Sequence, residues 1–423
     1  MMNQHVVAES INVRRLFIGI LVLAFGMRVG VMIMLQTWVF PSDRAFGYET
    51  GEIGYAIANG QGFSFPKMER AVGSTGEHYA VREAPVPTTW EAPVYPIIVG
   101  VVFWCLGSFT PASAIALELF QIVLSLLGCW MLFRLGKQIF NEQTGLLAAF
   151  IFALYPVSIH FSVQKVEHVP LLTLLGLVLL HQTIELSKRP SIARSLGLGA
   201  VAGITTLVNP VIIAFFPFGL LWFLAKCQNS WTNLLKYSAA IVVCCGAMMS
   251  PWLIRNYLVF DRFVFIRPNF TRELVLANFP ESSMVEAVAA SDGELNTSYN
   301  QEAWNLVLRR PARMLEPIVN RVNRFWLRLG VSGARDQVIV AVSYYPVALL
   351  GLLGVWLTRR HPQGQLLIIY LLAMPIPFYL TWAARSRFRY PIEPVLILFA
   401  SYTVSTCFMV IMRRLRRERV MTG

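Results

Sequence analysis

Apolar runs of about 20 residues, the length that crosses a lipid bilayer, recur along the whole of this 423-residue sequence. Hydrophobic residues make up 56% of the chain and charged residues only 14%, and the mean hydropathy is +0.56. This composition is too apolar for a soluble protein of such length. It predicts an all-α polytopic membrane protein with one integral membrane domain over residues 1–423.

Ten candidate spans follow from these runs, and the basic residues between them indicate the orientation of the chain. The spans are 15–39, 112–134, 145–163, 169–187, 195–208, 210–226, 235–253, 337–358, 365–383 and 392–412. Because positively charged connectors stay on the cytoplasmic side, ten crossings place both termini and the basic tail 413–423 in the cytoplasm. Pro93 to Gly107 is then a juxtamembrane or re-entrant helix. The alternative is that Pro93 to Gly107 crosses fully as an eleventh span, while one short segment, such as 195–208, does not cross.

This orientation leaves two long loops on the outer face, residues 41–92 and 253–336. Between Tyr299 and Arg328, apolar residues alternate with arginines, which is typical of amphipathic helices on a membrane surface. We expect these helices to be interrupted near Pro311 and Pro317.

The sequence lacks the motifs of several soluble enzyme classes. It has no Walker loop, dinucleotide fingerprint, nucleophile elbow or HExxH motif. Six cysteines lie mostly inside apolar runs and show no metal-ligand spacing, so they predict no metal site. The net charge of +13 lies largely in cytoplasmic connectors and the tail, and it does not indicate a nucleic-acid partner.

Two carboxylates stand three residues apart in the first outer loop, at Glu49 and Glu52. On a helix this spacing places both on one face. A carboxylate at a boundary between water and lipid can have a raised pKa and act as a general base on a hydroxyl. The alternative is a solvated surface charge.

A second charged group lies in the short outer turn 164–168, which contains Lys165 and Glu167. Ionisable groups at the end of a membrane helix are often functional, although a salt bridge explains them equally well. The neighbouring His160 and His168 have no partners at ligand spacing, and we interpret them as helix-end residues.

Arginines follow two of the spans on the outer side. They are Arg255, Arg262 and Arg267 after the span 235–253, and Arg385, Arg387 and Arg389 in the last outer turn. Outward arginines run against the positive-inside tendency, and the planar guanidinium group fits phosphate oxygens. A lipid headgroup explains any single one, whereas two clusters on one face favour a dedicated phosphate site.

Several short segments occur in the order found in a known family. They are Tyr48-Glu49-Thr50-Gly51-Glu52-Ile53 through Gly60-Gln61-Gly62-Phe63-Ser64, Trp90-Glu91-Ala92-Pro93-Val94-Tyr95-Pro96, Asn209-Pro210, Pro251-Trp252-Leu253-Ile254-Arg255-Asn256-Tyr257 to Arg267-Pro268-Asn269-Phe270, and Arg387-Phe388-Arg389-Tyr390-Pro391-Ile392-Glu393-Pro394. The ordered set resembles the bacterial membrane glycosyltransferases of family 39 type. These belong to the GT-C class, together with protein O-mannosyltransferases and the lipid A aminoarabinose transferase.

The resemblance implies a GT-C-like bundle of about 10–11 transmembrane helices with juxtamembrane helices on the outer face. It also implies a sugar donor carried on a polyprenyl phosphate, with transfer at the periplasmic face of a bacterial cytoplasmic (inner) membrane. Glu49 matches the acidic position of the first outer loop, which is the base in that family. Since the commoner motif opens with an aspartate, the base stays open among Glu49, Glu52 and Asp43. Glu167 matches the family's second acidic residue.

The resemblance also suggests how the remaining residues contribute. Tyr48, Trp90 and Tyr95 lie in or beside the matched segments and are expected to position substrate. The groups expected to hold the donor phosphate are Lys165, Arg255, Arg267, Arg387, Arg389 and Tyr390. The acceptor, a lipid, protein or glycan hydroxyl, and the sugar, a hexose or a pentose, stay open. No cofactor is specified, and the facing carboxylates leave a divalent cation open.

The expected chemistry is a single displacement. A carboxylate deprotonates the acceptor hydroxyl, and cations stabilise the departing phosphate. Because the displacement is direct, it inverts the anomeric centre. Two alternatives are a transporter or flippase that grips a phosphorylated lipid, and a noncatalytic subunit of an envelope assembly complex. The sequence shows no internal repeat of the kind common in transporters.

Overall fold

The computed structural model describes residues 2–39, 49–66, 84–267, 269–279, 304–327, 334–381 and 386–422. Helices make up nearly all of this part of the chain. Two short strands, β1 (Ser64–Phe65) and β2 (Val86–Pro87), pair antiparallel with Ser64 opposite Pro87. The predicted all-α membrane fold is therefore confirmed.

Seven helical segments in the described ranges are long and apolar enough to cross a membrane. They are Val13–Leu35 of α1 (Met2–Leu35), α4 (Pro111–Ile139), α7 (Val169–Lys188), α10 (Trp231–Phe260), Gln337–Thr358 of α15 (Ala334–Thr358), Pro362–Leu380 across α16 (Pro362–Ala373) and α17 (Ile376–Leu380), and Arg387–Leu415 across α18 (Ser386–Arg389), the 3-10 turn η4 (Tyr390–Ile392) and α19 (Glu393–Thr422). The bent pair of α5 (Glu142–Leu154) and α6 (Pro156–Val163) makes an eighth if the two helices form one span. Three shorter apolar helices accompany them: α3 (Val94–Leu106), α8 (Ile192–Val208) and α9 (Phe216–Lys226).

Two predicted spans differ from the observed helices in ways that bear on the site. The span expected over 145–163 bends by 55° between α5 and α6, because Pro156 has no amide hydrogen to continue the helix. The span expected to end at residue 253 continues to Phe260 at the end of α10. Arg255 therefore lies within a helix and not in the loop that follows it.

The second long loop contains helices, as predicted from its pattern. Within the described residues these are α11 (Asn269–Asn278), a helical turn over 304–309, the 3-10 turn η3 (Pro311–Met314) and α14 (Leu315–Leu327). Pro317 lies in the first turn of α14, where a missing amide hydrogen costs no helical bond. The interruption expected at this proline thus falls at the start of the helix.

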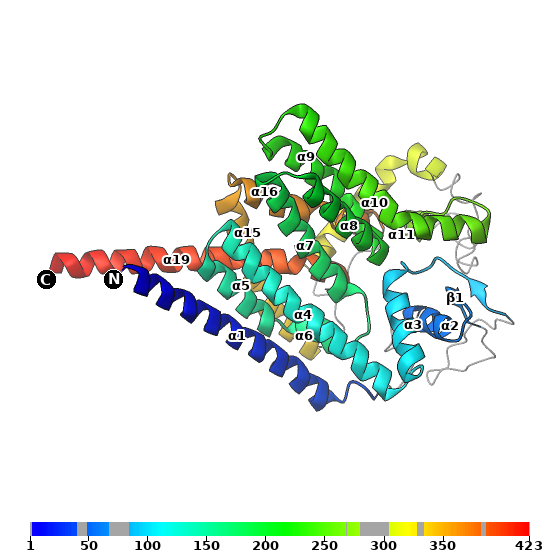
Figure 1. The fold of residues 1–423 in the computed structure, drawn as a ribbon, viewed down its shortest axis with the longest axis horizontal. Coiled ribbons are helices and arrows are strands. Elements are labelled where there is room, and N and C mark those ends of the chain that lie inside the picture. Colours follow the sequence, from blue (N-terminus) through cyan, green and yellow to red (C-terminus); the bar gives the residue numbers. More distant parts are fainter. Residues whose placement is uncertain are drawn as a thin grey trace.

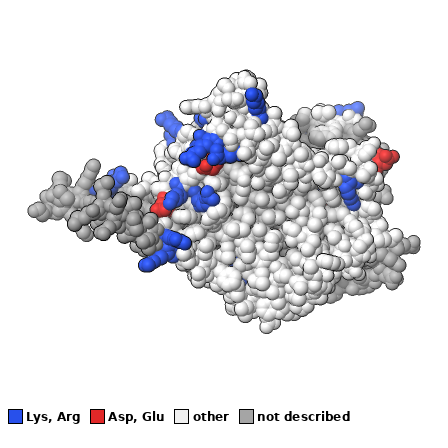
Figure 2. Space-filling model, in the orientation of Figure 1, with Lys and Arg blue, Asp and Glu red and all other residues white. Residues whose placement is uncertain are grey.

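Both chain termini lie at one end of the molecule, while α2 (Glu49–Ala58), β1 and α3 lie at the other (Figure 1). On the face shown in Figure 2, charged side chains gather toward the end with the termini, and an uncharged surface covers the middle. Exposed leucine, valine and tryptophan side chains, such as Val243, Leu258 and Trp356, belong to these apolar helices. An integral membrane protein needs such an apolar belt because lipid surrounds its middle.

Glycines set the closest helix crossings. A Cβ atom on Gly199 would lie 2.5 Å from the carbonyl oxygen of Ile241, and one on Gly203 would lie 2.8 Å from that of Cys245. Helices α8 and α10 thus pack backbone to backbone, as small residues allow in membranes. Glycine serves in the same way where Gly136 of α4 meets Gly145 of α5.

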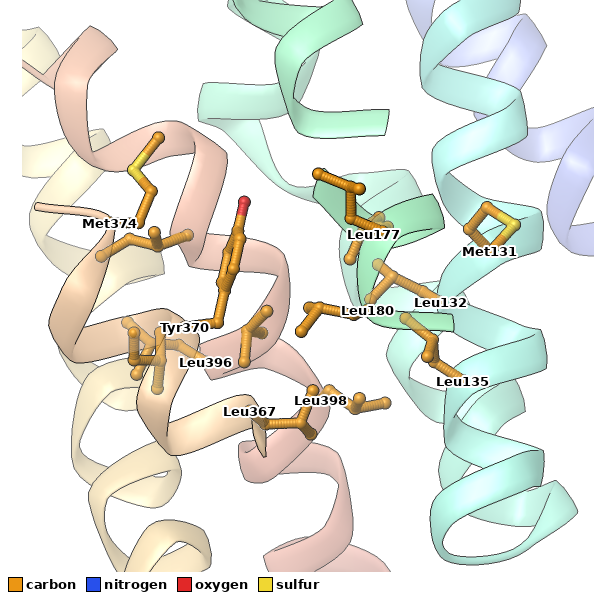
Figure 3. Close-up of a cluster of buried hydrophobic side chains, with 14 of the residues drawn as sticks. Met131, Leu132, Leu135, Leu177, Leu180, Leu367, Tyr370, Met374, Leu396 and Leu398 are labelled. Carbon is orange, nitrogen blue, oxygen red and sulfur yellow. The ribbon is translucent and has the colours of Figure 1, made fainter. Parts of the chain in front are cut away.

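The main core lies between α4, α7, α16 and α19 and is built largely of leucine (Figure 3). Tyr370 of α16 is fully buried there, and its hydroxyl points at Gly176 of α7, where any side chain would collide with it. This core fixes α7 and the start of α19 relative to each other. The turns that precede these two helices carry the charged groups described next.

Candidate active site

Glu49 begins α2, the first helix after the first span, and a tight crossing with α3 holds this helix in place. A Cβ atom on Gly54 would lie 2.7 Å from Val99, and one on Gly100 would lie 2.7 Å from Ile57. The predicted helical segment around the two carboxylates is thus confirmed. Glu52 is buried at 7% exposure, whereas Glu49 is only partly buried. The carboxylates at the N-terminus also favour this helix electrostatically.

The environment of Glu49 raises the pKa of its carboxyl group. Burial is the main cause, and the nearby carboxylate of Glu91 acts in the same direction. A hydrogen bond from Trp90 and the charge of Arg267 oppose the shift. Glu49 is therefore one member of a charged group whose other members precede α3 and follow α10.

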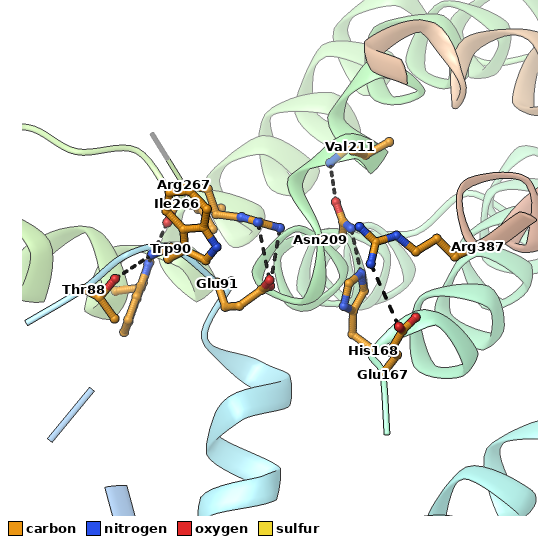
Figure 4. Close-up of polar contacts among 11 residues, drawn as sticks. Thr88, Trp90, Glu91, Glu167, His168, Asn209, Val211, Ile266, Arg267 and Arg387 are labelled. Atoms are coloured by element: carbon orange, nitrogen blue, oxygen red, sulfur yellow. Dashed lines mark hydrogen bonds and ion pairs between the residues drawn. The ribbon is translucent and has the colours of Figure 1, made fainter. Parts of the chain in front are cut away.

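Glu91 and Arg267 form an ion pair at the centre of this group (Figure 4). Their side-chain atoms are 3.4 and 3.5 Å apart, and both side chains are mostly buried. Beside them, Arg272 of α11 lies with its guanidinium 5.3 Å from the centre of the Trp90 ring. Sequence analysis assigned no role to Glu91, although it lies inside the Trp90-to-Pro96 segment that carries the family resemblance.

A second group forms in the turn between α6 and α7, where Gln121 of α4 fixes the backbone. Its side-chain oxygen accepts hydrogen bonds from the Glu167 amide at 3.0 Å and the Tyr95 hydroxyl at 2.6 Å. Its side-chain nitrogen donates to the Lys165 carbonyl at 2.8 Å. Tyr95, predicted to position substrate, thus helps to position the turn that contains Glu167.

Glu167 and the cations around it are loosely paired. Its Oε1 atom is 3.9 Å from both Lys165 Nζ and Arg387 Nη1, beyond hydrogen-bond distance. Glu167 Oε2 and Arg387 Nε are buried and have no hydrogen-bond partner among the described residues. An acceptor on Glu167 and a donor on Arg387 are therefore both unoccupied, which suits a polar ligand.

His168 lies between the two charged groups (Figure 4). Its Nε2 atom is 2.9 Å from Asn209 Nδ2, and Asn209 Oδ1 accepts a hydrogen bond from the Val211 amide at 3.1 Å. Burial lowers the pKa of His168 to about 4, with Arg267 and Arg387 acting in the same direction and Glu167 opposing them. Charges of both groups thus act on His168, which lies between them in Figure 4, and together they make up the candidate site.

Three more of the predicted phosphate-binding residues have close protein partners, as Arg267 has in Glu91. Arg255 donates to the carbonyls of Phe63 at 2.7 Å and Thr88 at 3.0 Å, which ties α10 to the strand pair. Arg389 bonds Glu393 at 2.6 Å, and Tyr390 donates to Ser158 at 3.1 Å. These contacts show how the three residues support the fold, and phosphate binding by them stays a prediction.

Other predicted features fall differently. Tyr48 and Asp43 lie outside the described residues. Within the described ranges no three His, Cys, Asp or Glu side chains form a metal-binding cluster. The sequence indicated a helix-end residue at His168, and Asn209-Pro210 entered only as a segment of the family resemblance. Their pairing joins positions 41 residues apart, which spacing along the chain does not reveal.

Residues 92–254 match the family model described as dolichyl-phosphate-mannose-protein mannosyltransferase. The fold is similar to that of the archaeal oligosaccharyltransferase AglB from Archaeoglobus fulgidus, solved with an inhibitory peptide and a dolichol-phosphate, with a TM-score of 0.56 and 15% identity over 95% of the chain. It is also similar to ArnT from Cupriavidus metallidurans bound to undecaprenyl phosphate, with a TM-score of 0.50 and 15% identity over 89% of the chain.

The chain spans about half of the AglB structure (52%) and 59% of the ArnT structure. At these identities the likeness establishes a shared fold. No sequence among the curated proteins matches the chain.

Proposed function

We propose that this chain transfers a sugar from a polyprenyl-phosphate donor to a hydroxyl acceptor. Its partial family match and its fold relate it to the GT-C membrane glycosyltransferases. The lipid-phosphate ligands of the AglB and ArnT structures support this class of donor. The acceptor is a hydroxyl of a lipid, protein or glycan. The transferred group is a hexose or a pentose.

The observation that carries the proposal is a set of facing carboxylates and arginines: Glu91 pairs with Arg267 at 3.4 Å, and Glu167 lies 3.9 Å from Arg387. Glu49 belongs to this set, and burial raises the pKa of its carboxyl group. A carboxylate with a raised pKa is a better proton acceptor than one in water. Guanidinium groups bind phosphate oxygens in two-point contacts. One base and separate cations are the groups that displacement of a lipid phosphate requires.

In the proposed reaction, Glu49 removes the proton from the acceptor hydroxyl as its oxygen attacks the anomeric carbon. The bond between that carbon and the phosphate oxygen breaks, and its electron pair leaves with the phosphate. Arg267, Arg387 and Lys165 stabilise the charge that develops there. A single displacement of this kind inverts the anomeric centre.

Glu52 is the alternative base within the described residues, and its deeper burial makes it less accessible to an acceptor. Arg255, Arg389 and Tyr390 hold the elements that carry the site, through the contacts given above. We place the site at the periplasmic face of a bacterial inner membrane, with both termini in the cytoplasm. The termini lie at the end of the molecule opposite α2 and α3 (Figure 1), as this arrangement requires.

The test uses the full-length protein in liposomes with a panel of polyprenyl-phosphate sugars and a cell-envelope extract as acceptor. Release of free polyprenyl phosphate is measured for the wild type, Glu49→Gln and Glu52→Gln. Glu316→Gln is the matched control, because Glu316 is an exposed carboxylate on α14.

We expect release by the wild type and the control, and loss of release in Glu49→Gln. Activity in both Glu49→Gln and Glu52→Gln would refute a base on α2. No release with any donor would favour the transporter or assembly alternatives.

A further inference from the structure

The Asn209–His168 pair has a defined direction of hydrogen bonding. The Val211 amide donates to Asn209 Oδ1, so the amide group of Asn209 is oriented with its NH2 toward His168. That NH2 group has no acceptor capacity, and His168 Nε2 must therefore accept. A neutral imidazole that accepts at Nε2 carries its proton on Nδ1.

The Nδ1–H group of His168 is available to a ligand. Among the described residues this group has no hydrogen-bond partner, and its nitrogen is not buried. The adjacent residue, Glu167, has its Oε2 atom buried and unpaired. Two consecutive residues thus provide an uncharged donor and an unpaired acceptor.

This combination selects for a particular ligand chemistry. Hydroxyl groups both donate and accept, so the hydroxyls of a sugar ring can donate to Glu167 and accept from His168. A phosphate oxygen only accepts, and the Glu167 carboxylate would repel it. The pair therefore suits the ring hydroxyls of a sugar better than the phosphate of the donor.

We propose that Glu167 and His168 form a subsite for a hydroxyl group of the transferred sugar, and that Asn209 is a positioning residue that keeps the His168 proton on Nδ1. This inference rests on the proposed function, since it assigns the sugar-binding part of the same site. It also makes Asn209 and His168 determinants of donor specificity.

The first test pairs a side-chain change with donor changes. His168→Phe keeps an aromatic ring against Tyr95, whose ring lies 6.5 Å away edge to face. It removes the Nδ1–H group that donates the hydrogen bond. We expect the KM for the lipid-linked donor to rise about tenfold, the order expected for one lost hydrogen bond. In a series of monodeoxy sugar donors, one should have a KM about tenfold higher than the parent donor with the wild type. With His168→Phe, the same deoxy donor and the parent donor should have nearly equal KM values.

The second test uses Asn209→Asp, which keeps an oxygen for the Val211 amide but accepts at both side-chain atoms. The introduced carboxylate would then bind a proton on His168 Nε2 and raise the pKa of His168 from about 4. Below the new pKa the imidazolium still donates from Nδ1. Above it, neutral His168 keeps its proton on Nε2 and loses the Nδ1 donor.

The donor KM of Asn209→Asp should therefore rise as pH rises through the new pKa, whereas that of the wild type shows no such step above pH about 4. The charged and titratable groups that face His168 are Glu167, Arg267, Arg387 and the Tyr95 ring, and they are the same in both proteins. Asn229→Asp, an added carboxylate at an exposed position, is the control and should behave as the wild type.

Nitrogen-15 NMR of histidine-labelled full-length protein gives a readout that does not need turnover. We expect the His168 signals of a neutral imidazole protonated at Nδ1 in the wild type, and protonated at Nε2 in Asn209→Asp at high pH. A wild-type Nε2–H tautomer, or an active enzyme whose donor KM is unchanged by His168→Phe, would overturn the inference. An inactive wild type that shows the expected tautomer would instead count against the proposed function alone.

Discussion

The guanidinium of Arg28 donates a hydrogen bond of 2.9 Å to the carbonyl of Ala153, inside the apolar bundle. Arg28 belongs to the first span and is fully buried, while Ala153 lies just before the bend between α5 and α6. The bend frees carbonyl groups that a straight helix would pair, and lipid cannot satisfy them. Arg28 also bonds Ser125 at 3.0 Å and Ser158 at 2.9 Å, so one side chain joins α1, α4, α5 and α6.

Replacing Arg28 by leucine should therefore destabilise the protein strongly. The change leaves the Ala153 carbonyl without its side-chain donor, at about 1–3 kcal/mol for a buried group left unpaired. It also removes the charged partner of Ser125 and Ser158, whose hydroxyls keep each other at 3.2 Å. We expect a clearly lower Tm in detergent micelles. Arg194→Leu is the control, because Arg194 is exposed and its side chain donates to one carbonyl, that of Arg189. Equal Tm values for the two variants would show that Arg28 does not stabilise the bend.

Sequence alone predicts the helices of this protein because the information is local. Apolar runs of span length give the membrane helices, and the Glu49–Glu52 spacing gives α2. The partners of Arg28 are not predictable in this way, since Ser125 and Ser158 lie 97 and 130 residues further along the chain. Only the presence of a charge inside the span 15–39 hints at them.

The candidate site shows the same division. Sequence singled out Glu49, Glu167, Arg267 and Arg387 as candidates. The charges of Glu167, Arg267 and Arg387 act on His168, and that of Arg267 also acts on Glu49. Sequence did not identify Glu91 or the Asn209–His168 pair, because these contacts depend on how loops from separate helices meet. Asn209-Pro210 carries part of the family resemblance, but this segment alone does not indicate that the Asn209 side chain contacts His168.

Glu49→Gln should abolish transfer without loss of stability. A general base contributes about 10²- to 10⁴-fold to rate, so turnover should fall by at least a hundredfold. Because the pKa of Glu49 is raised in the folded protein, its ionisation costs stability as pH rises through that pKa. The Tm of Glu49→Gln at pH 7 should thus equal or exceed that of the wild type. A lower Tm at pH 7 would mean that the ionised carboxylate stabilises the fold.

Glu91→Gln should shift the acidic limb of the rate profile to lower pH. The Glu91 carboxylate raises the pKa of Glu49 and also pairs with Arg267, the cation that lowers it. Removing the Glu91 charge therefore lowers the pKa of Glu49 on both counts, and the base stays ionised in more acidic solution. The measurement is kcat/KM against pH. Glu273→Gln serves as a control because Glu273 pairs with Arg272 on α11, and an identical shift in that variant would contradict the specific role of Glu91.

Arg387 and Arg389, two residues apart, should respond oppositely to replacement. Arg387 is partly exposed, with Nη1 3.9 Å from Glu167, so Arg387→Leu should keep the Tm and raise the donor KM at least tenfold through a lost phosphate contact. Arg389 is 1% exposed and donates to Glu393 at 2.6 Å and to the Phe325 carbonyl at 2.9 Å. Arg389→Leu leaves Glu393 as a buried charge without its cation, at about 3–5 kcal/mol. Thermal unfolding and donor titration of both variants separate the two roles. A stable Arg389→Leu protein with a raised donor KM would instead indicate that Arg389 binds the donor phosphate.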